Sequence, residues 1–202
     1  MPSLRGTDLL VATGNAGKLE EFAALLAPYG TNIRSLTDLN LPEPDETEYT
    51  FAGNALLKAR AAARASGLPT LADDSGLVVC DLGGAPGIYT ADWAETGKGR
   101  SFALAMTKTW GLLQATGTPQ PHRAAFRCVL AVVWPDGQEQ VFDGRLPGQI
   151  VWPMRGVRGH GYDPIFQPDG HSQTMGEMDL ILKNQISHRA DAVRALIAGC
   201  FA

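Results

Sequence analysis

A run of small residues ends in a lysine where an apolar strand is expected to meet a helix. The apolar segment 9–12 leads into Thr13-Gly14-Asn15-Ala16-Gly17-Lys18, and apolar residues recur at helical spacing over 19–26. Such a turn places backbone N–H groups and one cation at a helix N-terminus, where phosphate binds well. The spacing is too short for a Walker A loop, and Leu19 stands where that motif has a hydroxyl residue. An ordinary strand-to-helix turn with a surface lysine is the alternative interpretation.

Two adjacent acids occur in the segment Ala72-Asp73-Asp74-Ser75-Gly76, beside an expected strand. Neighbouring side chains of a strand point to opposite faces of a sheet, so we expect one carboxylate to face a ligand and the other to brace the backbone. A carboxylate beside a phosphate needs a cation between the two negative groups. Mg²⁺ suits this position because it binds carboxylates together with substrate phosphates. A solvated acidic turn is the alternative.

Further acids precede the next expected helix, and one more cation lies within it. Glu43, Asp45 and Glu46 occur in the loop before it, and each could supply a second carboxylate. Asn54 and Lys58 are four residues apart and therefore share one helix face. A solvated polar stripe is the alternative for that face.

The C-terminal part of the chain has residues suited to a planar base. The segment Gly159-His160-Gly161-Tyr162-Asp163-Pro164-Ile165-Phe166 combines small residues, an aromatic ring and an acid, which suits a wall on which a base could stack. Lys183 precedes His188-Arg189, which begins a helix, and two cations in a first turn oppose the helix dipole. That mismatch favours a ligand with negative charge or acceptor atoms. A packed turn and ordinary helix-end charges are the alternatives.

The elements that must position these residues predict an α/β fold. Strands are expected over residues 8–12, 31–36, 70–72, 77–80, 123–134, 139–144 and 148–152, and helices over 17–27, 51–66, 100–114 and 189–198. Thr50 and Ser187 are expected helix caps, and the proline-containing acidic segment 40–48 is expected to be an exposed loop. Strands separated by helices, with one antiparallel meander, indicate a mixed central sheet flanked by helices.

Composition indicates an ordinary globular chain. Its 202 residues suit a single domain over 1–202, and the net charge of −4 gives no reason to expect binding to a nucleic acid polymer. No apolar run approaches a membrane span, and the N-terminus does not resemble a signal peptide. The three cysteines are far apart and form no C-x-x-C pair, so we expect neither zinc nor disulfides, and a reducing cytoplasm.

Taken in order, these motifs resemble the inosine triphosphate pyrophosphatase family. The resemblance covers nearly the whole chain from about residue 8, and it rests on the segments Thr13–Lys18, Phe51–Ala59, Ala72–Gly76, Gly83–Gly87, Gly161–Phe166 and Ser187–Arg189. It implies an elongated, two-lobed α/β domain with a central cleft that forms a homodimer. It also implies Mg²⁺-dependent hydrolysis of deaminated purine nucleoside triphosphates (ITP, dITP, XTP) to the monophosphate and pyrophosphate, which cleanses the nucleotide pool.

The resemblance also implies roles for individual residues. Asp74 resembles the proton acceptor and metal ligand, with Asp73 beside it, and Lys58 resembles the second cation on the phosphate side. Glu46 is the best match to the second metal ligand, with Glu43 or Asp45 as alternatives. The residues that resemble substrate contacts are Thr13, Gly14, Asn15, Ala16, Gly17, Lys18, Ser75, His160, Gly161, Tyr162, Asp163, Lys183, His188 and Arg189.

The chain departs from the family pattern in two places. His160 stands where phenylalanine is frequent, and Leu180-Ile181-Leu182 replaces a Pro-Ala-Glu-like segment before Lys183. Two other functions are alternatives: a Maf-like nucleotide pyrophosphatase acting on modified pyrimidines, and a non-catalytic nucleotide-binding module. The second would need no metal-side acid, so the Asp73-Asp74 pair argues against it.

Overall fold

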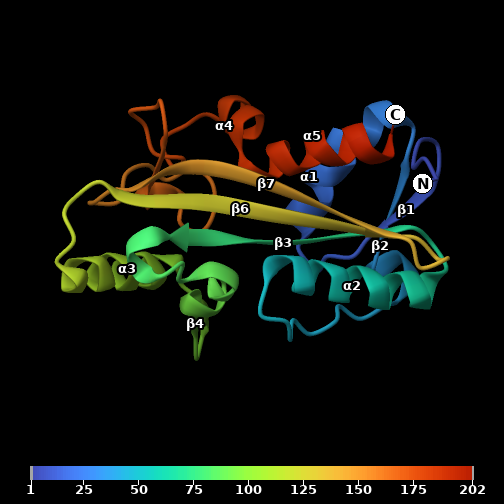
Figure 1. Cartoon of the computed structure of the whole chain (residues 1–202), viewed down its shortest axis with the longest axis horizontal. Helices are drawn as coiled ribbons and strands as arrows, with labels where there is room; N and C mark the ends of the chain where they lie inside the picture. Colours follow the sequence, from blue (N-terminus) through green and yellow to red (C-terminus); the bar gives the residue numbers. More distant parts are fainter. Residues whose placement is uncertain (1, 202) are drawn as a thin grey trace. The chain divides into compact units, whose positions relative to one another are not determined.

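The computed structural model of the chain describes residues 2–201 and contains a mixed six-stranded sheet with the order β2-β1-β3-β6-β7-β8 (Figure 1). The strands are β1 (Asp8–Val11), β2 (Asn32–Ser35), β3 (Thr70–Val79), β6 (His122–Val133), β7 (Glu139–Ile150) and β8 (Phe166–Pro168). Strand β1 pairs in parallel with β2 and β3, whereas β7 and β8 are antiparallel. The predicted mixed central sheet with flanking helices is confirmed.

The chain divides into two compact units. The first unit comprises residues up to Asp74, Cys128–Gly144 and the segment from Ala192, and the second comprises Ser75–Arg127 and Arg145–Asp191. The chain passes from one unit to the other within β3, β6, β7 and the last helix, α5 (His188–Cys200).

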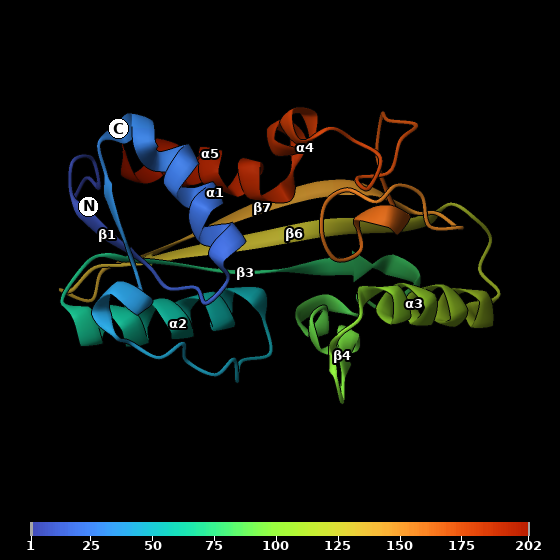
Figure 2. The ribbon, with the colours of Figure 1, turned by 180° about the vertical axis from the view of Figure 1, so that it is seen from behind.

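Helices cover both faces of the sheet in the first unit. Helix α1 (Ala16–Leu26) and the C-terminal part of α5 lie on one face, and α2 (Phe51–Ser66) lies on the other (Figures 1 and 2). Leu9 and Val11 belong to the core on the α1 side, whereas Leu10 and Ala12 belong to the core on the α2 side. The period of two along a strand therefore assigns each residue to one helix or the other.

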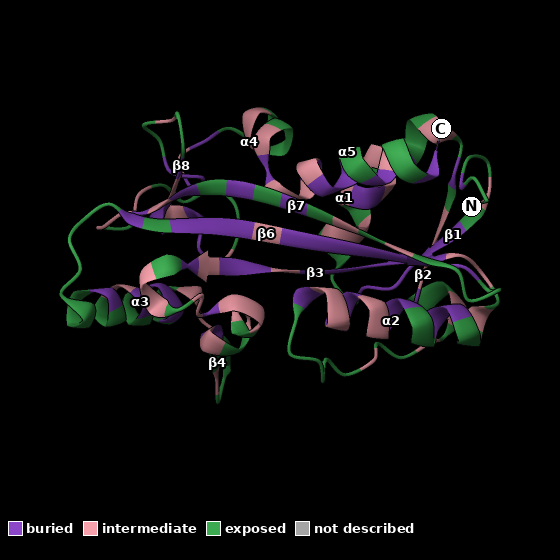
Figure 3. Ribbon diagram, viewed as in Figure 1, coloured by how far each residue is buried: buried purple, intermediate pink, exposed green. Residues whose placement is uncertain are grey.

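The second unit has its own core, built on the remaining halves of the long strands. Helix α3 (Phe102–Thr116) and helix α4 (Leu180–Ile186) belong to it, as does a hairpin of β4 (Glu95–Thr96) and β5 (Gly99–Arg100). Its buried cluster includes Leu77, Phe126 and Phe166. Figure 3 shows that β6 is buried along most of its length, as its run of apolar residues requires.

Several short 3₁₀ helices connect these elements. They are η1 (Ala27–Tyr29), η2 (Thr37–Leu39), η3 (Cys80–Leu82), η4 (Gly87–Tyr89), η5 (Asp92–Ala94) and η6 (Asp163–Ile165). In the described part of the chain, no helix has the length and apolar character needed to cross a membrane.

Two expectations about the elements were wrong, and one helix was not predicted. Segments 70–72 and 77–80 form one continuous strand, β3, and the acidic residues lie inside it; neighbouring strands on both sides override the turn-forming composition. Segment 148–152 is not a separate strand, because residues 148–150 are the end of β7. Helix α4 was not predicted, although Asp179 caps it by accepting a hydrogen bond from the Leu182 N–H at 2.8 Å.

The caps that border the proposed site are confirmed. Thr50 caps α2 by accepting from the Gly53 N–H at 2.9 Å, and Gly67 ends that helix with φ +68°. Ser187 accepts from the Ala190 N–H at 3.1 Å at the start of α5. The buried face of α5 includes the predicted Ala192, Val193 and Leu196.

Candidate active site

The predicted phosphate turn lies between β1 and α1 in the first unit. The Asn15 side chain caps α1 by accepting from the Lys18 N–H at 3.2 Å, and Thr13 Oγ1 accepts from the Asn15 N–H at 3.2 Å. Residues 14–17 are exposed. These bonds fix the backbone of the turn and leave its surface accessible, as binding of an anion requires.

Gly14 has a steric role in the turn. A Cβ atom at this position would collide with the carboxylate of Glu43. The acidic loop therefore lies against this turn, with the Glu43 carboxylate next to Gly14.

The two adjacent aspartates face opposite sides of the sheet, as predicted. Asp73 points to the α1 side, where its Oδ2 atom forms an ion pair with Lys18 Nζ at 2.7 Å. Asp74 points to the α2 side, where its Oδ2 atom accepts from Asn54 Nδ2 at 3.0 Å. The assignment follows from β3, because Leu71 belongs to the α1-side core and Ala72 to the α2-side core. Asp73 thus anchors the lysine of the turn.

The environment of Asp74 disfavours its charge. Burial, with a smaller contribution from the negative charge of Glu46, raises the pKa of its carboxyl to about 6, against the opposing effects of the hydrogen bond from Asn54 and the positive charges of Lys58 and Lys18. A carboxyl with a pKa close to neutrality can exchange protons under physiological conditions. A strongly perturbed acid beside a phosphate turn is characteristic of an active site.

Lys58 is a buried cation on α2. Its side chain is 4% exposed and forms an ion pair with Glu46. Burial by itself lowers the pKa of Lys58, but the charge of Asp73 and the interaction with Glu46 outweigh it, so the pKa is raised above the usual value. The ammonium group is therefore kept charged close to both aspartates.

The chemistry of these acids fits a hard divalent cation. No cluster of three or more His, Cys, Asp or Glu side chains within residues 2–201 is placed to hold a metal. Asp74 and Glu46 interact electrostatically, and that crowding of negative charge helps to raise the pKa of Asp74. Magnesium commonly binds to one or two carboxylates and completes its coordination with water and substrate phosphates. The donor set therefore fits Mg²⁺ bound together with a polyphosphate.

In the second unit, the Asp163 carboxylate links two other predicted base-binding residues, His160 and Lys183. Its Oδ2 atom accepts from the His160 N–H at 2.6 Å and from Lys183 Nζ at 2.5 Å. Gly159, with φ +80°, is required beside them, because a Cβ atom there would collide with Asp163 and approach Lys183 Nζ to 2.6 Å. The imidazole of His160 belongs to an exposed residue, so it can meet a ligand.

Tyr162 occupies a different environment from its neighbours. The residue is 1% exposed, its hydroxyl donates to the Thr90 carbonyl oxygen at 3.2 Å, and its ring packs edge-on against Phe102. Burial raises the pKa of the phenol above its usual range. The side chain contributes to the core of the second unit and shapes the loop that carries His160.

Helix α5 carries the last two predicted site residues, His188 and Arg189, in its first turn. The His188 ring stacks on Phe126 with centroids 5.1 Å apart, and both His188 and Arg189 are half-buried. The same first turn includes Asp191, whose carboxylate accepts from the Arg145 N–H at 3.1 Å. This acid offsets part of the charge mismatch expected from the sequence.

Each unit thus gathers one part of the predicted set. The first contains the turn Thr13–Lys18 with Glu46, Lys58, Asp73 and Asp74; the second contains His160–Asp163, Lys183, His188 and Arg189. Ser75 is half-buried and directly follows Asp74 along β3. Sequence reasoning placed Asn54 beside Lys58 but gave it no role, although its position one turn before that lysine was the available signal.

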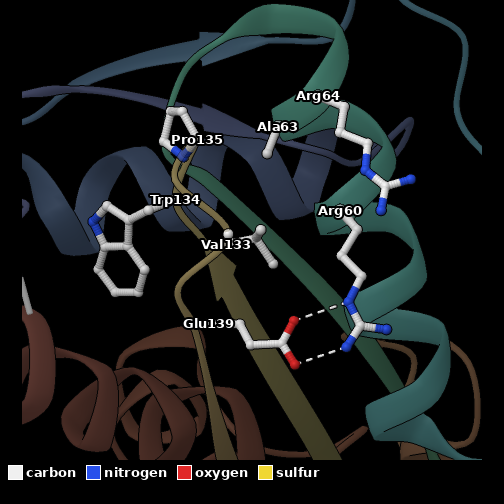
Figure 4. Close-up of a pocket in the computed structure, with 8 residues that line it drawn as sticks. Arg60, Ala63, Arg64, Val133, Trp134, Pro135 and Glu139 are labelled. Atoms are coloured by element: carbon white, nitrogen blue, oxygen red, sulfur yellow. Dashed lines mark hydrogen bonds and ion pairs between the residues drawn. The ribbon is translucent and has the colours of Figure 1, made fainter.

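A separate hollow in the first unit contains none of these residues. It has a volume of about 160 Å³ and is lined by residues of α2 and the β6–β7 turn, including Ala63, Arg64 and Pro135. Figure 4 shows Arg60 in this hollow, held by Glu139 through two hydrogen bonds of 2.9 and 2.7 Å. The charge of Arg60 is therefore already balanced by Glu139 within the hollow.

The strand-to-helix turn, its ion-paired lysine and the buried acid with a raised pKa give this α/β protein features that are characteristic of an enzyme active site. The chain belongs to the Ham1 family, whose model matches residues 9–199. It is 57% identical over 196 residues to a protein named dITP/XTP pyrophosphatase from Ruegeria pomeroyi, covering 97% of this chain and 96% of that one. A protein of the same name from Rhodospirillum centenum is 52% identical over 197 residues, covering 98% and 96%.

Solved structures agree with this assignment. A HAM1 protein from Coxiella burnetii matches with a TM-score of 0.90 and 35% identity, over 96% of this chain and 98% of that one. A protein from Mycobacterium abscessus, titled as a nucleoside-triphosphatase and dITP/XTP pyrophosphatase, matches with a TM-score of 0.76 and 39% identity, over 94% and 98%.

Proposed function

We propose that this chain hydrolyses ITP, dITP and XTP to the monophosphate and pyrophosphate and so removes deaminated purines from the nucleotide pool. The observation that carries the proposal is the buried Asp74 beside a lysine-anchored phosphate turn, in a chain 57% identical to a protein named dITP/XTP pyrophosphatase. The names of the relatives, dITP/XTP pyrophosphatase, also favour deaminated purines over the modified pyrimidines of a Maf-like enzyme.

The reaction follows from the charges in the first unit. The phosphate turn binds the triphosphate through its backbone N–H groups, and Lys18 and Lys58 neutralise the charge on the β- and γ-phosphates. Asp74 accepts a proton from the water that attacks the α-phosphorus. The bond between the α-phosphorus and the bridging oxygen breaks, and pyrophosphate leaves.

Asp74 and Glu46 are the proposed ligands of Mg²⁺. When bound, the ion would polarise the phosphate and lower the pKa of a bound water molecule. Asp73 serves indirectly, since its ion pair with Lys18 fixes the position of that ammonium group.

Base recognition is assigned to residues of the second unit, with Ser75 as a further substrate contact. Hypoxanthine and xanthine have a 6-oxo acceptor, whereas adenine has a 6-amino donor. Donors from His188 and Arg189 fit the acceptor, and an unsatisfied buried donor costs roughly 1–3 kcal/mol. His160 offers an exposed ring for stacking, and Asp163 holds that segment to Lys183.

Other properties are proposed from the family resemblance. They are a homodimer, a single elongated domain with the substrate in a central cleft, and action in the cytoplasm on free nucleotides.

A direct assay tests the proposed function. Pyrophosphate release is measured with ITP, XTP, dITP, GTP and ATP, with Mg²⁺ and with EDTA. We expect release from the first three substrates and its loss in EDTA. Equal rates on ATP and ITP would contradict the proposed selectivity, and the absence of release from every substrate would contradict the proposed enzyme.

A further inference from the structure

Asn54 is a buried carboxamide whose two ends bind two different parts of the proposed site. The residue is 2% exposed. Its Oδ1 atom accepts from the Glu48 N–H at 2.9 Å, and its Nδ2 atom donates to Asp74 Oδ2 at 3.0 Å. One side chain therefore connects the end of the acidic loop to the acid on β3.

Few side chains can make both contacts. A carboxamide has a donor and an acceptor in one plane, so it can bind a backbone N–H and a carboxylate together. Aspartate at this position would keep the acceptor but place a second carboxylate against Asp74. Alanine would make neither bond and would leave two buried polar groups without this partner.

The start of α2 brings the loop within reach of Asn54. Gly53 is in contact with the preceding segment, because a Cβ atom there would lie 2.7 Å from Glu48 Cβ and 3.0 Å from Thr50 Oγ1. The chain can therefore fold back against the first turn of the helix. This places the Glu48 N–H over the Asn54 side chain.

Lys58 holds the same loop at a second point. It lies one turn beyond Asn54 on α2 and pairs with Glu46. The loop is thus fixed to one helix face through the side chain of Glu46 and the backbone of Glu48. Of Asn54 and Lys58, it is Asn54 that joins the loop to Asp74 by hydrogen bonds, since its side chain accepts from the Glu48 N–H and donates to Asp74.

We propose that Asn54 is a positioning residue that orients the Asp74 carboxylate and holds the acidic loop so that Glu46 and Asp74 act together. The proposal deepens the proposed function and rests on it. Asn54 is buried and bonds Asp74, so its loss should affect turnover more than the binding of the triphosphate by the turn Thr13–Lys18.

The test compares two variants of the full chain with the wild type. Asn54→Ala removes both hydrogen bonds, and Asn54→Asp keeps the shape and the acceptor for the Glu48 N–H. Asn32→Ala is the matched control, because Asn32 also bonds an aspartate, Asp8, at 2.8 Å but in an exposed position. Each rate is divided by the folded fraction measured by circular dichroism.

For positioning, we expect kcat on ITP to fall by about 100-fold in both Asn54 variants, with KM changed by less than about threefold. Hydrogen–deuterium exchange at the Glu48 amide, measured without substrate, should become faster in Asn54→Ala and stay slow in Asn54→Asp. Asn32→Ala should match the wild type in both measurements.

Other results would overturn the inference. If kcat per folded molecule is unchanged, or if both Asn54 variants fail to fold, Asn54 has only a structural role. Unchanged exchange at Glu48 in Asn54→Ala would exclude the connection to the loop. These outcomes differ from failure of the proposed function, in which the wild type itself would not hydrolyse ITP, dITP or XTP.

Discussion

Replacing Asp74 by asparagine should stabilise the fold while it removes activity. Burial raises the pKa of Asp74 from 3.8 to about 6. One pKa unit corresponds to about 1.4 kcal/mol, so the charged carboxylate costs about 3 kcal/mol of folding free energy near neutral pH. Asparagine is nearly isosteric and can still accept the hydrogen bond from Asn54, so Asp74→Asn should recover about that amount.

The sign of this effect depends on pH. Between about pH 4 and pH 6 the Asp74 carboxyl is ionised in the unfolded chain but still protonated in the folded one, so the folded state binds more protons. As the pH rises from about 4 to about 6, the free energy of unfolding therefore falls, because the folded chain must give up a proton that the unfolded chain has already lost. The advantage of Asp74→Asn should be complete above about pH 7 and should vanish near pH 4.

Thermal unfolding in EDTA measures this effect. For a chain of this size, about 3 kcal/mol corresponds to an increase in the midpoint of about 6–12 °C at pH 7.5. Hydrolysis of ITP should fall by about 10²- to 10⁴-fold, as expected for loss of a general base. Asp92→Asn, a change at an exposed acid, is the control and should alter neither quantity. A midpoint for Asp74→Asn that equals the wild type at pH 7.5, or an advantage that persists at pH 4, would refute the reasoning.

Three further predictions concern substrate binding and the bond that breaks. Lys18→Ala should weaken the apparent affinity for ITP by roughly tenfold to a hundredfold, since it removes a charged phosphate contact and leaves Asp73 buried without that ion pair; the exposed Lys98→Ala is the control, and equal effects on KM would argue against the phosphate turn. Gly14→Ala should raise KM for ITP by displacing Glu43, and an unchanged KM would show that the contact with the acidic loop is dispensable. Hydrolysis of ITP in ¹⁸O-labelled water should place the label in IMP, as mass spectrometry at low conversion can measure. Label in pyrophosphate or orthophosphate would be inconsistent with attack on the α-phosphorus.

Local signals in the sequence predicted much of this site. The small-residue turn Thr13–Lys18 and the helical spacing of apolar residues over 19–26 placed the start of α1 within one residue of its observed start at Ala16. The bounds of α2 followed from Thr50 and Gly67 in the same way. The period of a strand required Asp73 and Asp74 to face opposite sides. These features depend on residues close together in the chain.

The tertiary structure decided which partners those side chains meet. Lys18 and Asp73 are 55 residues apart, and they pair because α1 packs on the face of β3 to which Asp73 points. The opposite face holds α2, so Asp74 meets Asn54 and becomes a buried acid with a raised pKa. Tyr162, by contrast, is buried in the core of the second unit.

The continuity of β3 has the same origin. The segment Asp73–Gly76 has the composition of a turn, and its neighbours in the sheet hold it extended. The sequence by itself therefore determined the types of the functional groups and the faces they occupy. Their ion pairs, burial and pKa values required the packing of elements distant in the chain, because electrostatic and solvation energies depend on the groups that surround a charge in space.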